Sequence, residues 1–163
     1  MKEKSEAELL HRMAAYCSTA ERCIQEIEKK LSSAGAGPEM SGRIISRLLK
    51  EKFIDESRYA RSFVNDKLRY NKWGKIKIGY ELRKKNIPEN IREESIGQID
   101  EKEYQSILMN LLKNKKRTTK GKDERDVFTK LLRFATGRGF ESREIIPVLK
   151  QLFQTGDYAD DFE

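Results

Sequence analysis

The sequence predicts an all-α protein, and three observations support this prediction. Only three prolines occur in 163 residues, β-branched residues are few, and no apolar run suits a strand buried on both faces. Charged residues make up 37% of the chain, as large a share as the apolar ones, so a modest core must carry a surface dense in charge. Short amphipathic helices meet both conditions better than a buried parallel sheet does.

Apolar residues recur with a helical period in nine segments. The predicted helices span residues 5–17, 19–34, 38–52, 55–71, 75–86, 88–98, 101–116, 123–138 and 142–153. Gly35 and Gly37 end the second helix, and Asn86, which tolerates a left-handed cap almost as well as glycine, ends the fifth. Pro88 then lies in a first helical turn, where proline is accepted. Pro147 lies inside the last pattern, where it should kink the helix or move its start downstream.

An acidic helix start followed by an aromatic residue occurs twice, at an offset of 45 residues. The copies are Ile54-Asp55-Glu56 with Tyr59 and Phe63, and Ile99-Asp100-Glu101 with Tyr104 and Leu108. In each copy the acidic residue can cap backbone N–H groups and interact favourably with the helix dipole. We therefore expect three tandem three-helix modules at 5–54, 55–99 and 100–154, then an acidic tail at 155–163. Chance similarity among amphipathic helices is the alternative explanation.

The residues that catalysis or metal binding would need are scarce. His11 is the only histidine, and Cys17 and Cys23 have the spacing of neither a redox pair nor a zinc site, so we expect both cysteines to act as small apolar residues. The glycines of 74–79 have the spacing of a phosphate loop but lack the Lys and Ser/Thr that must follow. Acidic pairs could form a nuclease-like metal site, but helix capping explains those at 55–56 and 100–101 better. We expect no catalytic residue, metal or cofactor, and hence no enzyme.

No segment approaches the roughly 20 apolar residues of a membrane span, and the first residues lack an apolar signal region, so a cytoplasmic protein is expected. The net charge of +7 is unevenly spread, because residues 58–85 hold ten basic and two acidic groups. Such a band attracts a polyanion or the acidic surface of a partner. The candidate residues for binding a filament or nucleic acid are Arg58, Arg61, Arg69, Lys72, Lys75, Lys77, Arg83, Lys84 and Lys85.

The helix predicted at 55–71 separates aromatic from basic residues. Its helical period predicts a buried stripe made of Tyr59, Ala60, Phe63 and Tyr70, while Leu68 lies between the two faces. The opposite side carries a basic row made of Arg58, Arg61, Arg69 and Lys72. This row could follow a phosphate backbone, and Trp73 or Tyr70 could stack on a base if it points outward. The alternative is a solvated charged face with Trp73 packed at a helix junction. A further basic cluster at 113–122 is expected to be a mobile loop.

The stretch from Phe53 to Val64, followed by Gly74, Lys77-Ile78, Glu81-Leu82, Lys85 and Ile87, resembles the central module of the RecX family of bacterial RecA regulators. Residues 16–31 resemble the family's first module, in which a Ser-x-x-Glu-type start opens a helix. The resemblance covers about residues 8–153. Asn86 stands where the family usually has glycine, 34–37 lengthens a tight turn, and Pro147 interrupts the last helix.

The resemblance implies tandem three-helix repeats in an elongated, curved array. It also implies that the chain lies along the groove of the RecA–DNA filament and suppresses ATP hydrolysis, strand exchange and coprotease activity, which would regulate DNA repair, recombination and the SOS response. A repeat array presents a long surface without a large core, which suits a polymeric partner. We expect a monomer that binds single- and double-stranded DNA weakly. The alternatives are a stand-alone DNA-binding protein and, with less support, a nuclease.

Overall fold

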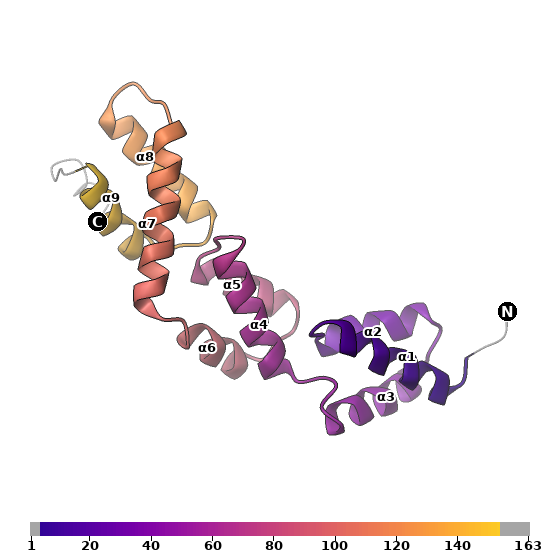
Figure 1. The fold of residues 1–163 in the computed structure, drawn as a ribbon. Coiled ribbons are helices and arrows are strands. Elements are labelled where there is room, and N and C mark those ends of the chain that lie inside the picture. Colours follow the sequence, from indigo (N-terminus) through magenta and orange to yellow (C-terminus); the bar gives the residue numbers. More distant parts are fainter. Residues whose placement is uncertain (1–3, 154–163) are drawn as a thin grey trace. The chain divides into compact units, whose positions relative to one another are not determined.

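Every regular element in the described part of the chain is a helix (Figure 1). The computed structural model describes residues 4–153, so the predicted tail at 155–163 lies outside the described residues. The helices are α1 (Glu6–Thr19), α2 (Ile24–Ser33), α3 (Pro38–Lys50), α4 (Glu56–Arg69), α5 (Lys75–Lys84), α6 (Glu89–Gly97), α7 (Glu101–Thr118), α8 (Glu124–Gly137) and α9 (Ser142–Phe153). The all-α prediction is confirmed, and every boundary except the start of α2 lies within two residues of its predicted place.

The start of α2 differs because its cap comes from a distant part of the sequence. Helix α1 continues through Ser18 and Thr19, whose hydroxyls donate to carbonyl oxygens of the preceding turn. Helix α2 begins at Ile24, and the side chain of its N-cap residue, Cys23, makes no capping hydrogen bond. The Ile24 N–H donates instead to Glu56 Oε2, 3.2 Å away at the start of α4. The expected Ser-x-x-Glu start near residue 18 is therefore wrong.

Four helices open with the same capping contact. The side chains of Ser5, Asp55, Asp100 and Asp123 each accept a hydrogen bond from the backbone N–H three residues later, at 3.2, 3.1, 2.9 and 2.8 Å. A buried side chain follows four residues after the first three caps, at Leu9, Tyr59 and Tyr104, but not after Asp123. The predicted caps at Asp55 and Asp100 are confirmed, and α1 provides a third copy of the pattern. The three modules at 5–54, 55–99 and 100–154 stay a prediction, because the cap at Asp123 lies inside the third of them.

Four helices end on a residue with a left-handed backbone. These residues are Gly35, Lys52, Asn86 and Gly139, with φ between 60° and 95°. The N–H of the next residue in each case donates back to a carbonyl oxygen five residues earlier, which closes the helix end. The cap predicted at Asn86 is thus confirmed. Lys52 adopts the same left-handed conformation, although a lysine lacks the backbone freedom of glycine. The sequence alone therefore does not predict a cap at this position.

Pro147 lies inside helix α9, and the helix begins at the predicted residue. The helix begins at Ser142, so the expectation that proline would move the start downstream is wrong. Pro147 is exposed, whereas Ile146 and Val148 on either side of it are buried. The ring therefore lies on the solvent side, where the loss of one backbone hydrogen bond is least costly.

The helices form two compact units. The first comprises the described residues up to Phe63 together with Leu82–Ser95. The second comprises Val64–Glu81 together with the described residues from Ile96 onward. Each unit has its own buried core, so each can be described by itself.

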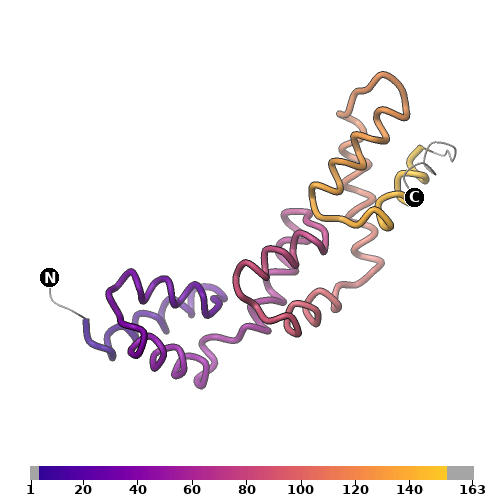
Figure 2. Tube along the Cα trace, turned by 180° about the vertical axis from the view of Figure 1, so that it is seen from behind, coloured from indigo at the N-terminus to yellow at the C-terminus, as the bar shows by residue number. Residues whose placement is uncertain are grey.

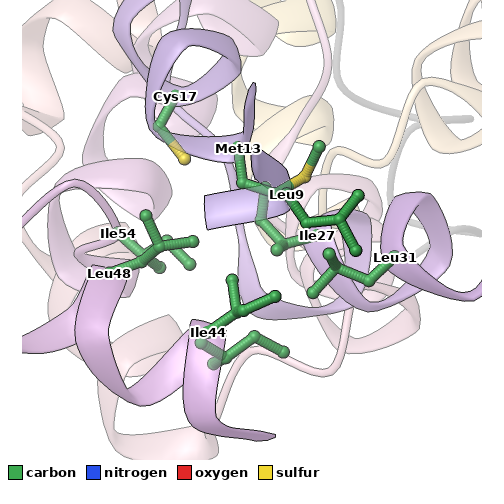
Figure 3. Packing of buried hydrophobic residues seen from close by; sticks show 9 residues of the cluster. Leu9, Met13, Cys17, Ile27, Leu31, Ile44, Leu48 and Ile54 are labelled. Atoms are coloured by element: carbon green, nitrogen blue, oxygen red, sulfur yellow. The ribbon is translucent and has the colours of Figure 1, made fainter. Parts of the chain in front are cut away.

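The core of the first unit joins α1, α2 and α3. Helix α3 packs on both α1 and α2. Figure 3 shows apolar side chains of these helices, together with Ile54 from the segment after α3, converging on one another. The labelled helical residues are Leu9, Met13, Cys17, Ile27, Leu31, Ile44 and Leu48. Cys17 is a free thiol within this cluster, and burial raises its pKa. Cys23 is free and fully buried, and burial raises its pKa as well, so both cysteines are buried apolar residues, as predicted.

The core of the second unit is built by α7, α8 and α9, which all pack on one another (Figure 2, orange to yellow). Aromatic pairs join these helices and the turn between α8 and α9. The ring centroids of Tyr104 and Phe140 are 5.2 Å apart, and those of Phe128 and Phe153 are 5.6 Å apart. All four side chains are buried, so aromatic rings form a large part of this core.

Candidate functional site

Groups that could perform chemistry are not gathered in the described part of the chain. His11 is exposed on α1. Residues 4–153 contain no group of three or more His, Cys, Asp or Glu side chains that could hold a metal ion. No described helix is both long and apolar enough to cross a membrane. The charged surface and its exposed apolar residues are therefore the candidate site.

Helix α4 orients its residues only partly as predicted. Tyr59 and Ala60 are buried and Phe63 is half-buried, but Tyr70 follows the helix and is 81% exposed. The prediction that Tyr70 belongs to the buried stripe is therefore wrong. Leu68, which fitted neither predicted face, is 2% exposed and is buried instead.

Arg58 is held by an internal partner. Its Nε lies 2.6 Å from Glu21 Oε2, and its Nη2 donates to the carbonyl oxygen of Lys52 at 3.1 Å. The hydrogen bond with Glu21 raises the pKa of the guanidinium. Arg58 thus ties the start of α4 to the connection between α1 and α2, and its charge is partly neutralised.

Arg61 and Arg83, two other arginines of the first unit, are not held by an internal partner in the described residues. Arg61 on α4 and Arg83 on α5 are exposed, and their side chains make no hydrogen bond or ion pair within residues 4–153. Unpaired cations bind anionic groups without first breaking an internal contact. These two residues are therefore the strongest members of the predicted basic set in this unit.

Lys84 and Lys85 adjoin a polar cluster on α2. The Gln25 amide donates to the carbonyl oxygen of Lys84 at 3.0 Å, and Lys85 Nζ lies 3.6 Å from Glu26 Oε1. The Tyr59 hydroxyl donates to the same Glu26 oxygen at 3.0 Å, and burial is the main cause that raises the pKa of this tyrosine. Lys85 is thus engaged in holding α2, while Lys84 is exposed.

In the second unit, two predicted binding residues pair with carboxylates of α7. Arg69 Nε lies 2.8 Å from Glu103 Oε1, and Lys75 Nζ lies 2.5 Å from Glu101 Oε1. Lys72 lies beyond the end of α4 with a φ of 56°, and its Nζ donates to the carbonyl oxygen of Arg69. The predicted basic row of four residues is therefore shorter than expected, because Lys72 lies outside α4. Its side chain caps the end of α4 instead.

Trp73 is packed instead of pointing freely outward. Its ring is half-buried, with Lys67 Nζ 4.9 Å and Lys77 Nζ 4.6 Å from the centroid. These contacts favour the alternative in which Trp73 packs at a helix junction. Tyr70 points outward, which leaves base stacking by that ring open.

Gly74 uses its N–H internally. The group donates to the carbonyl oxygen of Arg138 at 2.7 Å, and the Ile76 N–H donates to the carbonyl oxygen of Gly139 at 3.0 Å. The start of α5 is thus held against the turn between α8 and α9, where a phosphate loop would leave its N–H groups open. The glycine spacing at 74–79 serves packing.

The basic cluster at 113–122 differs from its prediction. Helix α7 continues to Thr118, so the first part of the cluster is helical. Lys116 Nζ donates to the carbonyl oxygen of Leu152 at 2.9 Å, and Lys115 Nζ lies 4.9 Å from the centroid of the Phe134 ring. The expected mobile loop is therefore wrong for this part, because these lysines secure α8 and α9.

The exposure of two apolar residues of α5 was not predicted from the sequence. Ile76 is 59% exposed and Tyr80 is 60% exposed. The signal was present, because Ile76 and Tyr80 are four apart, as are Ile78 and Leu82, and a helix places the two pairs on opposite sides.

Comparisons with known proteins give one family. Residues 55–96 match the model described as RecX, second three-helix domain. The chain is 30% identical over 154 residues to a regulatory protein RecX from Prosthecochloris aestuarii, which covers 93% of this chain and 98% of that protein. It is 34% identical to a regulatory protein RecX from Clostridium acetobutylicum, of which it spans 61%.

Solved structures show the same fold. A crystal structure of RecX from Lactobacillus salivarius has a TM-score of 0.80 and 22% identity, covering 92% of this chain and 97% of that one. A second crystal structure, of a regulatory protein RecX, also gives a TM-score of 0.80, at 24% identity and with 91% of this chain covered.

Proposed function

The chain belongs to the RecX family of regulatory proteins, and we propose that it binds the RecA–DNA filament and mainly inhibits its ATPase, strand-exchange and coprotease activities. This action would regulate DNA repair and recombination and limit the SOS response. The observation that carries the proposal is the similarity to a regulatory RecX protein along nearly the full length of both chains.

The exposed cations support a charged partner. Arg61 and Arg83 extend from α4 and α5 with no internal partner within the described residues, and the net charge is +7. A filament of protein and DNA presents phosphates and carboxylates, so these residues can contribute attraction that weakens with salt. The contribution of each such surface contact is modest, and the strength of binding depends on repetition along the filament.

A second candidate is a stand-alone DNA-binding protein that uses the basic residues of 58–85. The surplus of cations in this band favours it. The internal ion pairs of Arg58, Arg69 and Lys75 weigh against it, because a cation already paired releases fewer counterions from DNA.

The test is RecA's ATP hydrolysis on single-stranded DNA, titrated with this protein at two salt concentrations. A filament regulator should inhibit at concentrations far below those that coat the DNA. A coating protein should inhibit only near saturation, and its effect should appear equally with an unrelated DNA-dependent ATPase. Inhibition that appears only at saturation would contradict the proposal. Incubation of labelled DNA with the protein and magnesium checks the nuclease alternative, for which we expect no cleavage.

A further inference from the structure

Helix α5 carries two apolar stripes, of which its own core uses one. Ile78 and Leu82 are fully buried, whereas Ile76 and Tyr80 are more than half exposed. Each pair is spaced by one helical turn, and the two pairs lie on opposite sides of the helix. A single exposed apolar residue needs no explanation, but a second stripe on one helix indicates a partner.

Exposed apolar residues are concentrated near this stripe in the sequence. Four large apolar side chains of the described residues are strongly exposed, and three of them, Tyr70, Ile76 and Tyr80, fall within eleven consecutive residues. All three belong to the second unit. The fourth, Leu49, is 39% exposed on α3 of the first unit and offers a natural comparison.

The charge around the stripe decides which class of partner it suits. Residues 69–80 hold four cations and no carboxylate, a composition that by itself favours nucleic acid. The structure brings Glu103 to Arg69 and Glu101 to Lys75, so two of the four charges are paired within the unit. Nucleic-acid affinity depends on cations that displace counterions from phosphates, and paired cations do so poorly.

The two remaining cations are also engaged. Lys77 Nζ lies 4.6 Å from the centroid of the Trp73 ring, and Lys72 donates to the carbonyl oxygen of Arg69. Both keep a positive charge that a carboxylate can approach. Arg83, three residues beyond Tyr80 on α5, adds an exposed cation without an ion pair in the described residues. Tyrosine and arginine beside an aliphatic side chain have the composition of a protein-binding hot spot.

We propose that the exposed stripe formed by Ile76 and Tyr80 docks on a RecA subunit, into an apolar recess with a carboxylate near Lys77. This inference rests on the proposed function and adds a contact to it. The stripe supplies apolar burial that is insensitive to salt, while Arg61 and Arg83 supply the salt-sensitive attraction. Single-stranded DNA, on which Tyr80 could stack, is the competing occupant.

The test combines Ile76→Ser with Tyr80→Ser, which removes both apolar side chains without adding charge or changing helix propensity much. The matched control is Leu49→Ser, an exposed apolar residue on α3. We expect the concentration of the double variant that half-inhibits RecA ATPase to rise about tenfold, with the salt dependence unchanged. The control should inhibit as the parent does. Circular dichroism checks the fold, and the corresponding double alanine variant gives the same test if serine lowers the helix content.

Fluorescence anisotropy with a labelled single-stranded oligonucleotide separates the two occupants. We expect the double variant to bind the oligonucleotide as the parent does. Loss of oligonucleotide binding would show that the stripe contacts DNA. Unchanged inhibition of RecA would show that the stripe contacts neither RecA nor DNA. Either result overturns the inference. If the parent protein itself fails to inhibit RecA, the proposed function fails first and the docking inference with it.

Discussion

Gly74 lies against Gly139 so closely that neither position has room for a side chain. A Cβ atom at Gly74 would lie 2.3 Å from the backbone carbonyl carbon of Gly139, and one at Gly139 would lie 2.4 Å from Lys77 Cβ. Backbone hydrogen bonds flank the contact on both sides. The two glycines therefore permit the start of α5 to meet the turn between α8 and α9 inside the second unit.

Gly74→Ala should consequently destabilise the protein by about 3 kcal/mol, because the clash is with backbone atoms that cannot rotate away. Urea denaturation followed by circular dichroism measures this change. The matched control is Gly137→Ala in α8, where a Cβ meets nothing within 4 Å and the backbone is helical. That control should be neutral or stabilising by up to about 1 kcal/mol. Equal stability of the two variants would contradict the close contact.

Two matched positions of the sequence repeat should differ in their contribution to stability. Leu108 is fully buried in α7, whereas Phe63, its counterpart in α4, is only half-buried. We expect Leu108→Ala to cost about 2–5 kcal/mol and Phe63→Ala about half as much, although phenylalanine is the larger side chain. Thermal and urea denaturation of both variants provide the measurement. A larger loss at Phe63 would show that its ring is more deeply packed than its exposure indicates.

The helices were predictable because their signals are local. Asp55, Asp100 and Asn86 act on backbone groups within a few residues, so sequence alone located their caps. The start of α2 was not predictable, because its capping group, Glu56, is 32 residues away. Local patterns contain no information about such a contact until the fold brings the two segments together.

The candidate site was less predictable than the fold. Helical periodicity correctly placed Arg58, Arg61 and Arg69 away from the buried residues of α4, but it could not show that carboxylates from other segments pair with two of them. Tyr70 was misplaced because the period was extended past Arg69, where the helix ends. Charge pattern thus identified the basic region, and only the structure separated its paired cations from its unpaired ones.

The free energy of unfolding should depend on pH through the titration of Glu56. Burial is the main cause that raises its pKa above the ordinary value of 4.5, with repulsion from Glu28 adding to the rise and the Ile24 N–H opposing it. The folded state therefore holds the proton more tightly than the unfolded state. This contribution to stability is fully present below the unfolded pKa and is lost as pH rises through the folded pKa.

We accordingly expect the parent to gain stability relative to Glu56→Gln when the pH falls from 7 to about 4. Urea denaturation of both proteins across this range measures the difference. Comparison with the glutamine variant removes the effect of the other carboxylates, which titrate alike in both proteins. A difference that stays constant with pH, or that shrinks as the pH falls, would contradict a raised pKa at Glu56.

Reversing the unpaired cations should weaken filament inhibition without unfolding the protein. Arg58 and Arg69 are unsuitable for this experiment, because glutamate at either position would face Glu21 or Glu103 and disturb the fold. Arg61→Glu with Arg83→Glu avoids that difficulty, since both side chains are exposed and make no hydrogen bond or ion pair within the described residues. Each substitution should change stability by less than about 0.5 kcal/mol.

The double reversal should raise the concentration needed to inhibit RecA's ATPase and flatten its dependence on salt, because four units of charge are removed from the attraction. The matched control is Arg12→Glu with Lys29→Glu, which makes the same change of net charge on exposed residues of α1 and α2. If both double variants lose inhibition to the same extent, net charge alone governs binding. If Arg61 and Arg83 can be reversed with no loss, the contact surface lies elsewhere on the molecule. A selective loss would assign the electrostatic part of filament binding to α4 and α5.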